Sequence, residues 1–259
     1  MSGAASASPR YKYTVAVDLD EVLGGFLPAL TQWHNRVYGT TFSVDDYRSY
    51  SYCDLWGGSN ADSVAKVHEF FQASEFATGV RPIAGAVRTL RSLLDRARFV
   101  VVTSRQHVIA EQTRDWIERH FAGIFAGIEM GNHYDLASPN PDDMTLAGAA
   151  GGSVKRSKPD MCADVGAVAL IDDSVKYACQ CATACCDGDG PFLTILFGEY
   201  GWNTGDHVPQ IADGTLQSLI DDGKVIRVAT WEGEGVGMKE VLTRHLDSLD
   251  KQRQQKQIH

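Results

Sequence analysis

The chain has 259 residues, of which 44% are hydrophobic and 22% are charged, and its formal net charge is −9. That apolar fraction is typical of a globular protein with a buried core, and no apolar run approaches the roughly 18 residues that a membrane-spanning helix needs. With 33 acidic against 24 basic residues, the chain lacks the basic surface of a polynucleotide-binding protein. The composition therefore argues against whole-chain disorder, a membrane span and a polynucleotide partner, and it favours a small ligand.

The first ten residues, MSGAASASPR, are small and polar. They contain no apolar stretch like that of a secretory signal, so we expect a disordered tail over residues 1–10. The remnant of an organelle-targeting segment is the alternative. Without a secretory route in view, we expect a cytoplasmic protein with reduced cysteines.

Short apolar runs alternate with helical patterns along the chain. Each run is nearly continuous in β-branched and other apolar residues, as a strand buried on both faces would be. The runs are TVAVDLD from Thr14, RFVVVTS from Arg98, GAVALIDD from Gly166, FLTILFG from Phe192 and VIRVATW from Val225. Residues 82–97 and 106–121 between them show helical spacing. The alternation predicts an α/β protein with a Rossmann-like, doubly wound parallel sheet.

One segment breaks the alternation. Residues 25–80 contain no good strand, but FLPALTQWHNRVY and SVAKVHEFFQASEF are helical patterns. We therefore expect a small helical cap over residues 25–80, inserted after the first strand of an α/β core that comprises residues 11–24 and 81–250. The polar end of the chain, residues 251–259, is expected to fray.

Polar side chains follow three of the predicted strands. They are Asp18, Asp20, Thr103, Ser104, Asp172 and Asp173. Taken singly, an Asp pair is a common turn and a Ser or Thr a common helix cap. Ligands of an open parallel sheet, however, bind beyond the carboxyl ends of its strands. Four carboxylates gathered there cannot all ionise without a counter-cation, and their oxygen atoms suit Mg²⁺.

Four motifs occur in order along the chain: VAVDLDEVL, VVVTSR, SKPDM and ALIDDS. Together they resemble the four motifs of the haloacid dehalogenase-like superfamily of phosphohydrolases. DLDEVLGGFL, the inserted cap, RPIAGA and FGEYGWN are similar to the type C 5′-nucleotidases, the 5′(3′)-deoxyribonucleotidase group. The resemblance implies a haloacid dehalogenase-like fold and a Mg²⁺-dependent phosphatase that acts on (deoxy)nucleoside 5′-monophosphates.

The resemblance also implies a role for each acidic residue. Asp18 would attack phosphorus and form an aspartyl-phosphate. Asp20 would protonate the leaving oxygen and then activate water. Mg²⁺ would be bound by Asp18, Asp172 and the backbone carbonyl of Asp20. Asp173 would orient a metal-bound water or Lys158.

The same resemblance assigns the phosphoryl group to Thr103, Ser104 and Lys158, which would hold it by hydrogen bonds and charge. Lys155 is close enough in sequence to replace Lys158 in this role. Arg105 is a further candidate for contact with the leaving group or a second phosphate, although an Arg at a helix start is more commonly a surface residue.

Substrate choice is expected to lie in the cap. Phe26 matches the aromatic residue that stacks on the base in the deoxyribonucleotidase group, and Tyr52 and Trp56 are candidates for its partners. Cap aromatics are also common core residues. A phosphatase for another small phosphorylated metabolite and a non-catalytic nucleotide-binding relative are therefore the alternatives, and the oligomeric state stays open.

Four of the six cysteines lie close together in SVKYACQCATACC. On a helix, Cys179 and Cys186 would point in one direction while Cys181 and Cys185 would point in the opposite one. Thiolates divided between two faces cannot close a tetrahedral zinc site, so we interpret these cysteines as reduced packing residues.

Overall fold

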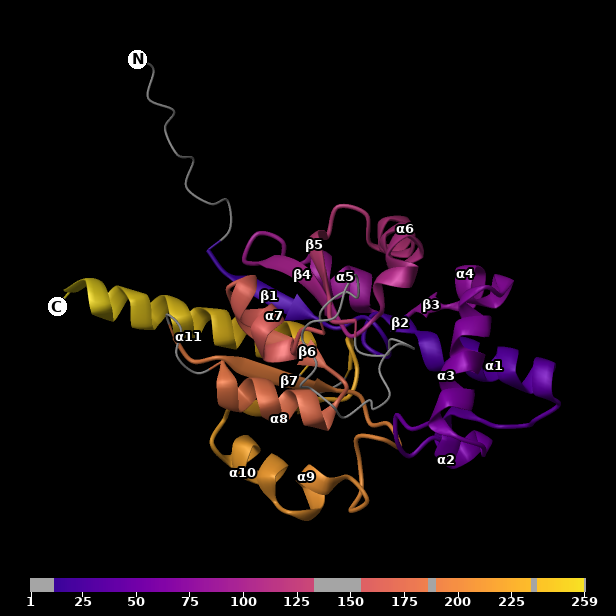
Figure 1. The fold of residues 1–259 in the computed structure, drawn as a ribbon. Coiled ribbons are helices and arrows are strands. Elements are labelled where there is room, and N and C mark those ends of the chain that lie inside the picture. Colours follow the sequence, from indigo (N-terminus) through magenta and orange to yellow (C-terminus); the bar gives the residue numbers. More distant parts are fainter. Residues whose placement is uncertain (1–11, 133–154, 186–189, 234–236, 259) are drawn as a thin grey trace.

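The computed structural model of the chain describes residues 12–132, 155–185, 190–233 and 237–258. At its centre is a six-stranded parallel sheet with the strand order β5-β4-β1-β6-β7-β8 (Figure 1). The strands are β1 Thr14–Val17, β4 Arg98–Thr103, β5 Phe125–Met130, β6 Ala167–Asp172, β7 Leu193–Phe197 and β8 Val225–Val228. The predicted doubly wound parallel sheet is confirmed. Its edge strand β5 was not predicted, because its FAGIEM sequence is half-exposed and carries no continuous apolar run.

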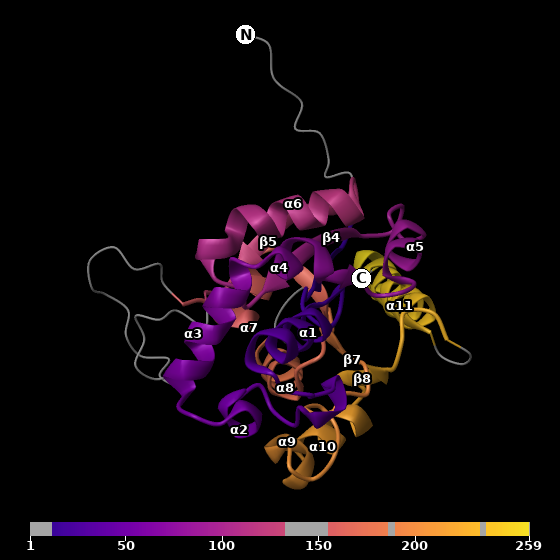
Figure 2. The same ribbon diagram turned by 90° about the vertical axis from the view of Figure 1, so that its right-hand side faces the viewer.

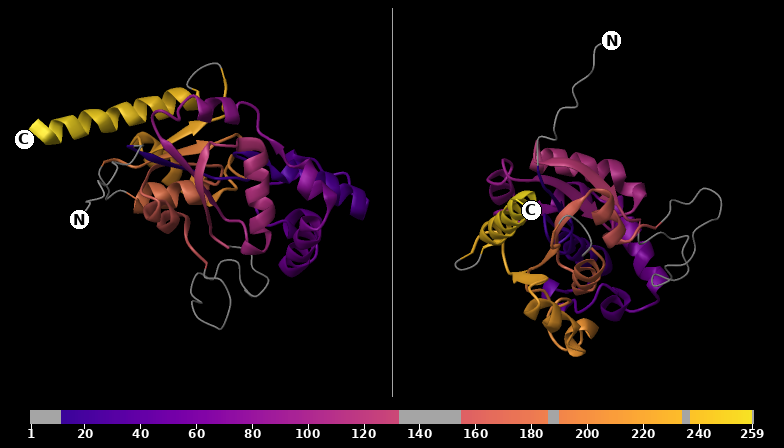
Figure 3. Two further views of the ribbon diagram at one scale, coloured as in Figure 1. Left: turned by 90° about the horizontal axis from the view of Figure 1, so that it is seen from above. Right: turned by 90° about the vertical axis from the view of Figure 1, so that its left-hand side faces the viewer.

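The two faces of the sheet are buried by different helices, as successive side chains of a strand point to opposite faces. From β1, Val15 and Val17 pack in one apolar cluster with helices α5, α6 and α11. Ala16 packs in another cluster with α7 and α8. Figure 3 shows α11 on one side of the sheet and α8 on the other. These helices are α5 Ala86–Arg91, α6 Ala110–Phe121, α7 Lys158–Asp164, α8 Val175–Ala184 and α11 Met238–Ile258.

Several shorter elements complete the core. They are the 3₁₀ helix η2 His107–Ile109 and the helices α9 Pro209–Ala212 and α10 Thr215–Asp221. Helix α11 continues to Ile258, past the position where the sequence predicts a frayed tail. The tail predicted over residues 1–10 lies outside the described residues. In the described parts of the chain, no helix combines the length and the hydropathy needed to span a membrane.

Four helices stand beyond one end of the sheet, between the short antiparallel strands β2 Gly24–Gly25 and β3 Arg81–Pro82 (Figures 1 and 2). We call α1–α4 the cap helices. They are α1 Phe26–Tyr38, α2 Cys53–Trp56, α3 Asn60–Phe71 and α4 Ser74–Gly79, with the 3₁₀ helix η1 Val44–Asp46 between α1 and α2. The paired strands bring the two ends of the insertion together, so the cap helices connect to the core at one point beside β1.

Candidate active site

The acidic strand ends meet at one edge of the sheet because β1 and β6 are neighbours in it. Asp18 directly follows β1, and its backbone N–H donates to the carbonyl of Ile171 at 2.8 Å. Asp172 ends β6 and Asp173 follows it. Carboxylate oxygens of Asp18, Asp172 and Asp173 lie within 4.8 Å of one another, and all three residues are buried. The structure thus brings together the carboxylates of two strands that are far apart in sequence.

One ammonium group lies among these carboxylates. Lys158, the first residue of α7, is fully buried. Its Nζ donates to Asp18, to Asp172 at 2.7 Å and to the backbone carbonyl of Val102 at 2.7 Å. Lys155 is only half-buried. Ser157 caps α7 by accepting a hydrogen bond from the backbone N–H of Asp160, so the helix start sets the position of the lysine.

Asp18 and Asp172 share the ammonium of Lys158, and the nearby third carboxylate of Asp173 leaves surplus negative charge. Burial raises the pKa of Asp18 to about 7, against the opposing effect of Lys158. Burial, with Asp172 and Asp18 nearby, holds the pKa of Asp173 well above its usual range. For Lys158, burial lowers the pKa, but Asp172 and Asp18 outweigh it and the pKa is raised. An all-oxygen donor set with excess negative charge fits a hard divalent cation such as Mg²⁺.

One indole and one phenol group orient Asp173. Its Oδ2 accepts a hydrogen bond from Trp202 Nε1 at 2.7 Å and another from the hydroxyl of Tyr50 at 3.0 Å. Asn203 donates to the backbone carbonyl of Asp173 at 2.9 Å. The FGEYGWN motif after β7 thus holds one acidic residue of the site. The contact with Lys158 that the sequence offers as one role for Asp173 is made by Asp172.

Asp20 faces a buried guanidinium. Arg105 Nε and Nη2 donate to the two carboxylate oxygens of Asp20 at 2.9 and 2.7 Å. Arg105 also donates to Thr113 Oγ1 at 3.1 Å, and its side chain is 5% exposed. Sequence reasoning names this arginine only as a secondary candidate, since nothing in the VVVTSR motif shows that its partner lies 85 residues earlier.

The two hydroxyl residues at the end of β4 lie beside this pair. Thr103 Oγ1 accepts a hydrogen bond from the backbone N–H of Arg105 at 3.2 Å, and the residue is buried. The hydroxyl of Ser104 donates to that of Tyr177 at 3.2 Å. Of the two, Ser104 lines the cavity described below.

The turn after Asp20 is unusual because Glu21 has a φ of 60°, a left-handed conformation that glycine adopts most easily. The Glu21 carboxylate accepts a hydrogen bond from the backbone N–H of Leu27 at 2.6 Å. A carboxylate at the N-terminus of a helix is favourable, so this contact compensates part of the backbone strain. Glu21 therefore connects the catalytic loop to the first cap helix.

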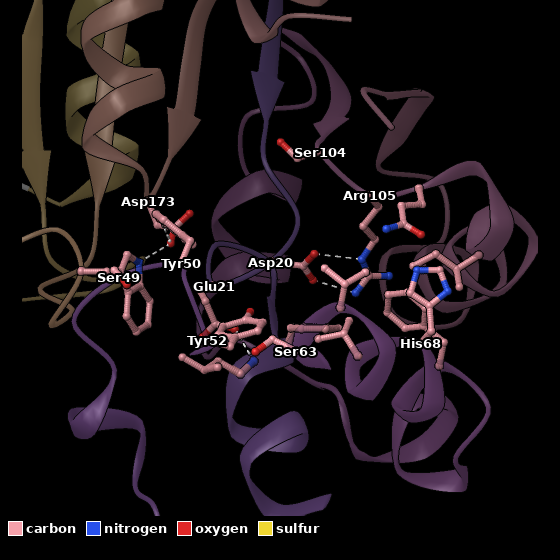
Figure 4. A pocket seen from close by; sticks show the side chains of 18 of the residues that line it. Asp20, Glu21, Ser49, Tyr50, Tyr52, Ser63, His68, Ser104, Arg105 and Asp173 are labelled. Atoms are coloured by element: carbon pink, nitrogen blue, oxygen red, sulfur yellow. Dashed lines mark hydrogen bonds and ion pairs between the residues drawn. The ribbon is translucent and has the colours of Figure 1, made fainter. Parts of the chain in front are cut away.

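A cavity of about 160 Å³ separates the sheet edge from the cap helices (Figure 4). Asp18, Asp20 and Asp173 line it from the core. Phe26 and Tyr52 line it from the cap segment. Trp56 does not; it stacks on Tyr52 at 4.9 Å and on His34 at 4.3 Å between ring centroids. The structure thus places two of the three predicted base-contacting aromatics at the cavity and the third behind them.

Two cysteines of helix α8 pack on different sides of it. Cys179 belongs to an apolar cluster with Val208 and Leu216, whereas Cys181 packs with Cys162 of α7. A side-chain hydrogen bond with Cys181, together with burial, raises the pKa of the Cys185 thiol. Cys186 lies outside the described residues.

Comparisons with known proteins agree with this geometry. Residues 12–130 match the family model described as 5′ nucleotidase, deoxy (pyrimidine), cytosolic type C protein. No curated protein sequence gives a significant match.

Solved structures share the fold. A haloacid dehalogenase-like hydrolase from Streptococcus pneumoniae is 11% identical, with a TM-score of 0.52 over 83% of this chain and 93% of that one. A provisionally assigned phosphatase from Clostridium difficile is 14% identical, with a TM-score of 0.53 over 86% and 96%. A haloacid dehalogenase-like protein from Agrobacterium tumefaciens is 15% identical, with a TM-score of 0.52 over 92% and 98%.

The family match covers the catalytic loop, the cap helices and β4, and the fold likeness extends to the rest of the chain. The resemblance expected from the motifs is confirmed on both counts. Residues 12–130 therefore carry the type C 5′-nucleotidase pattern, and the chain has the haloacid dehalogenase-like fold.

Proposed function

We propose that the protein hydrolyses (deoxy)nucleoside 5′-monophosphates by way of an aspartyl-phosphate, with Mg²⁺ as cofactor. One observation carries the proposal: two buried carboxylates, Asp18 and Asp172, share the ammonium of Lys158, and the carboxylate of Asp173 lies beside them. Asp18 and Asp173 line one end of a cavity whose opposite wall is apolar and aromatic. A phosphoryl group is suited to the charged end, and the organic part of the ester is suited to the other.

In the proposed reaction, Asp18 is the nucleophile and Asp20 is the acid and base. A carboxylate oxygen of Asp18 forms a bond to phosphorus, and the bond to the ester oxygen breaks. Asp20 gives its proton to that leaving oxygen. In the second step Asp20 takes a proton from water, whose oxygen attacks phosphorus and releases Asp18 and inorganic phosphate. Lys158 opposes the negative charge of the phosphoryl oxygens, and Thr103 and Ser104 are the proposed hydrogen-bond donors to them.

The proposed ligands of Mg²⁺ are Asp18, Asp172 and the backbone carbonyl of Asp20. Asp173 is a further oxygen donor at the cavity wall, while both oxygens of Asp172 also accept hydrogen bonds from Lys158 and Ser174. When bound, Mg²⁺ supplies neutralisation of charge, so that an anionic carboxylate can approach an anionic ester.

A substrate panel tests the choice of substrate. With Mg²⁺ present, we expect nucleoside 5′-monophosphates to give the highest kcat/KM among nucleotides, sugar phosphates and phenyl phosphate, and a metal chelator to abolish turnover. Higher kcat/KM for sugar phosphates would favour the alternative of another small-metabolite phosphatase. Tight nucleotide binding without any turnover would favour a non-catalytic relative.

Replacement of the nucleophile tests the mechanism. Asp18→Asn keeps the shape of the side chain but cannot form the aspartyl-phosphate, so we expect kcat to fall by about 10⁴-fold or more. Asp45→Asn, at an exposed cap position away from the cavity, is the matched control and should leave kcat unchanged. If Asp18→Asn retained wild-type kcat, a different nucleophile would be required.

A further inference from the structure

One face of helix α3 forms the cap wall of the cavity. The residues of this face are Asn60, Ser63, Val64, Val67, His68 and Phe71. Successive residues of a helix are 100° apart, so Ser63 and His68 stand at opposite borders of the face, about 140° from each other. Val64, Val67 and Phe71 lie between them, with Asn60 at the first turn of the helix. Figure 4 shows both polar residues on the cap side of the cavity, away from Ser104 and Asp173.

Both polar residues have a buried atom without a hydrogen-bond partner. Ser63 is 3% exposed, and neither its Oγ nor His68 Nε2 has a partner among the described residues. A buried polar group left without a partner costs about 1–3 kcal/mol. Proteins rarely keep such groups without a reason. In the wall of a cavity, an atom of a bound substrate can supply the missing partner.

The surrounding residues restrict what that substrate atom belongs to. Among the described residues that line the cavity, Arg105 is the only Lys or Arg, and Asp20 already accepts two of its hydrogen bonds. The α3 face carries no charged residue. A second phosphate at this end would therefore lack a cation. Phe26 and Phe71 offer rings to a flat group instead.

We infer that Ser63 and His68 are specificity-determining residues that hydrogen-bond the edge of an uncharged nucleobase. A hydroxyl and an imidazole can each donate and accept hydrogen bonds, which matches the carbonyl, ring N–H and amino groups along such an edge. The inference deepens the proposed nucleotidase function and rests on it for the identity of the substrate. Phe26 holds the face of the base, and the borders of α3 hold its edge.

A binding experiment that needs no turnover tests this assignment. The ligands are a nucleoside 5′-phosphonate, in which a P–C bond replaces the scissile ester bond, and benzylphosphonate, whose ring has no hydrogen-bonding atoms. Calorimetry with Mg²⁺ should show that Ser63→Ala and His68→Phe each weaken binding of the nucleoside phosphonate by about tenfold. Both variants should bind benzylphosphonate within about twofold of the wild type, a change that corresponds to a fraction of one hydrogen bond.

Ser59→Ala is the matched control on the same helix. Ser59 caps α3 by accepting a hydrogen bond from the backbone N–H of Asp62 and does not line the cavity. Its loss weakens the helix without removing a substrate contact, so nucleoside phosphonate affinity should stay at the wild-type value. Ser63→Ala, in contrast, should leave the thermal stability unchanged or raise it, because the removed hydroxyl has no partner.

Two outcomes overturn the inference: nucleoside phosphonate affinity unchanged in Ser63→Ala and His68→Phe, or an equal loss for benzylphosphonate. Failure of the proposed function would look different. A wild-type protein that binds the nucleoside phosphonate but hydrolyses no nucleotide would contradict the hydrolysis and leave the role of Ser63 and His68 intact.

Discussion

The two walls of the cavity treat their polar groups in opposite ways. At the sheet edge, Asp20 is paired with Arg105, and Lys158 connects Asp18 to Asp172. On the cap wall, Ser63 Oγ and His68 Nε2 are buried and have no hydrogen-bond partner among the described residues. The groups proposed to perform the chemistry are thus positioned without a substrate, as electrostatic preorganisation requires. The groups proposed to distinguish one substrate from another are left for the substrate to satisfy.

The largest effect should come from breaking the network at the sheet edge. Lys158→Met removes the only ammonium from a pair of buried carboxylates. Loss of one partner of a buried ion pair costs about 3–5 kcal/mol, so we expect the free energy of unfolding near pH 7 to fall by about that amount, with loss of phosphatase activity. Urea unfolding monitored by circular dichroism measures the free energy of unfolding, and the release of phosphate measures the activity.

The pH dependence of this variant gives an internal check. Without the ammonium, burial raises the pKa of Asp18 further, so the protonated form becomes more favourable in the folded state. The stability deficit should therefore be largest at alkaline pH and shrink as the pH falls towards about 7, where Asp18 of the wild type also becomes protonated. Lys155→Met is the comparison at the half-buried lysine; if it lost as much stability and activity, the assignment of Lys158 would be wrong.

A smaller effect is expected from the pair that orients Asp20. Arg105→Gln removes both hydrogen bonds to the carboxylate, so Asp20 should protonate the leaving oxygen less effectively. Positioned acid catalysis is worth about 10²–10⁴-fold, and we expect kcat to fall by about 10–100-fold for a nucleotide, whose alkoxide leaving group needs the proton. The fall should be several-fold smaller for p-nitrophenyl phosphate, whose leaving group departs without protonation.

This comparison of leaving groups separates positioning from a structural role. If Arg105→Gln distorted the cavity, kcat would fall equally for both substrates. That result would contradict the assignment of Arg105 as a positioning residue. Arg105→Lys is a useful second variant, because it keeps the charge but cannot donate two parallel hydrogen bonds to one carboxylate. The kcat of Arg105→Lys for the nucleotide should lie between those of the wild type and Arg105→Gln.

Local patterns in the sequence predict most of the fold. The continuous apolar runs from Thr14, Arg98, Gly166 and Phe192 all form inner strands, since burial on both faces is visible in the sequence itself. Helix α1 begins and ends at the residues of the FLPALTQWHNRVY pattern. Less was predictable where burial is partial: β5 was missed, and the helix expected over residues 82–97 is limited to α5. Residues Arg81 to Gly85 instead form β3 and the turn that leads back to the core.

The acidic cluster of the site was predictable because residues that follow adjacent parallel strands meet at one edge. Contacts between distant segments were not. The Trp202–Asp173 and Arg105–Asp20 hydrogen bonds depend on how loops close over the sheet, and neither leaves a periodic signal in the sequence. The same reason explains Ser63, which looks like any polar residue of an amphipathic helix until the cavity beside it is known.

The smallest effect concerns the cap helices alone. His34 is buried on α1, donates or accepts a hydrogen bond with Thr40 Oγ1 at 2.9 Å and stacks on Trp56. Burial, with Lys66 nearby, lowers the pKa of His34 to about 4 from an ordinary value of 6.5. The unfolded chain therefore binds a proton between these pH values that the folded chain excludes. The stability from the neutral ring is present above pH 6.5 and is lost progressively as the pH falls towards 4.

His34→Phe should remove this pH dependence while it keeps the aromatic stack. We expect the loss of unfolding free energy between pH 7 and pH 5 to be about 1–2 kcal/mol smaller in the variant than in the wild type. Half-buried His245, whose pKa is also lowered by burial, titrates alike in both proteins and cancels in the difference. His207→Phe is the control, because His207 is exposed and lies in the α/β part of the chain, outside the cap helices. Hydrogen exchange should locate the acid-induced opening in the cap helices first. Simultaneous opening of the sheet would show that the two walls of the cavity unfold as one unit.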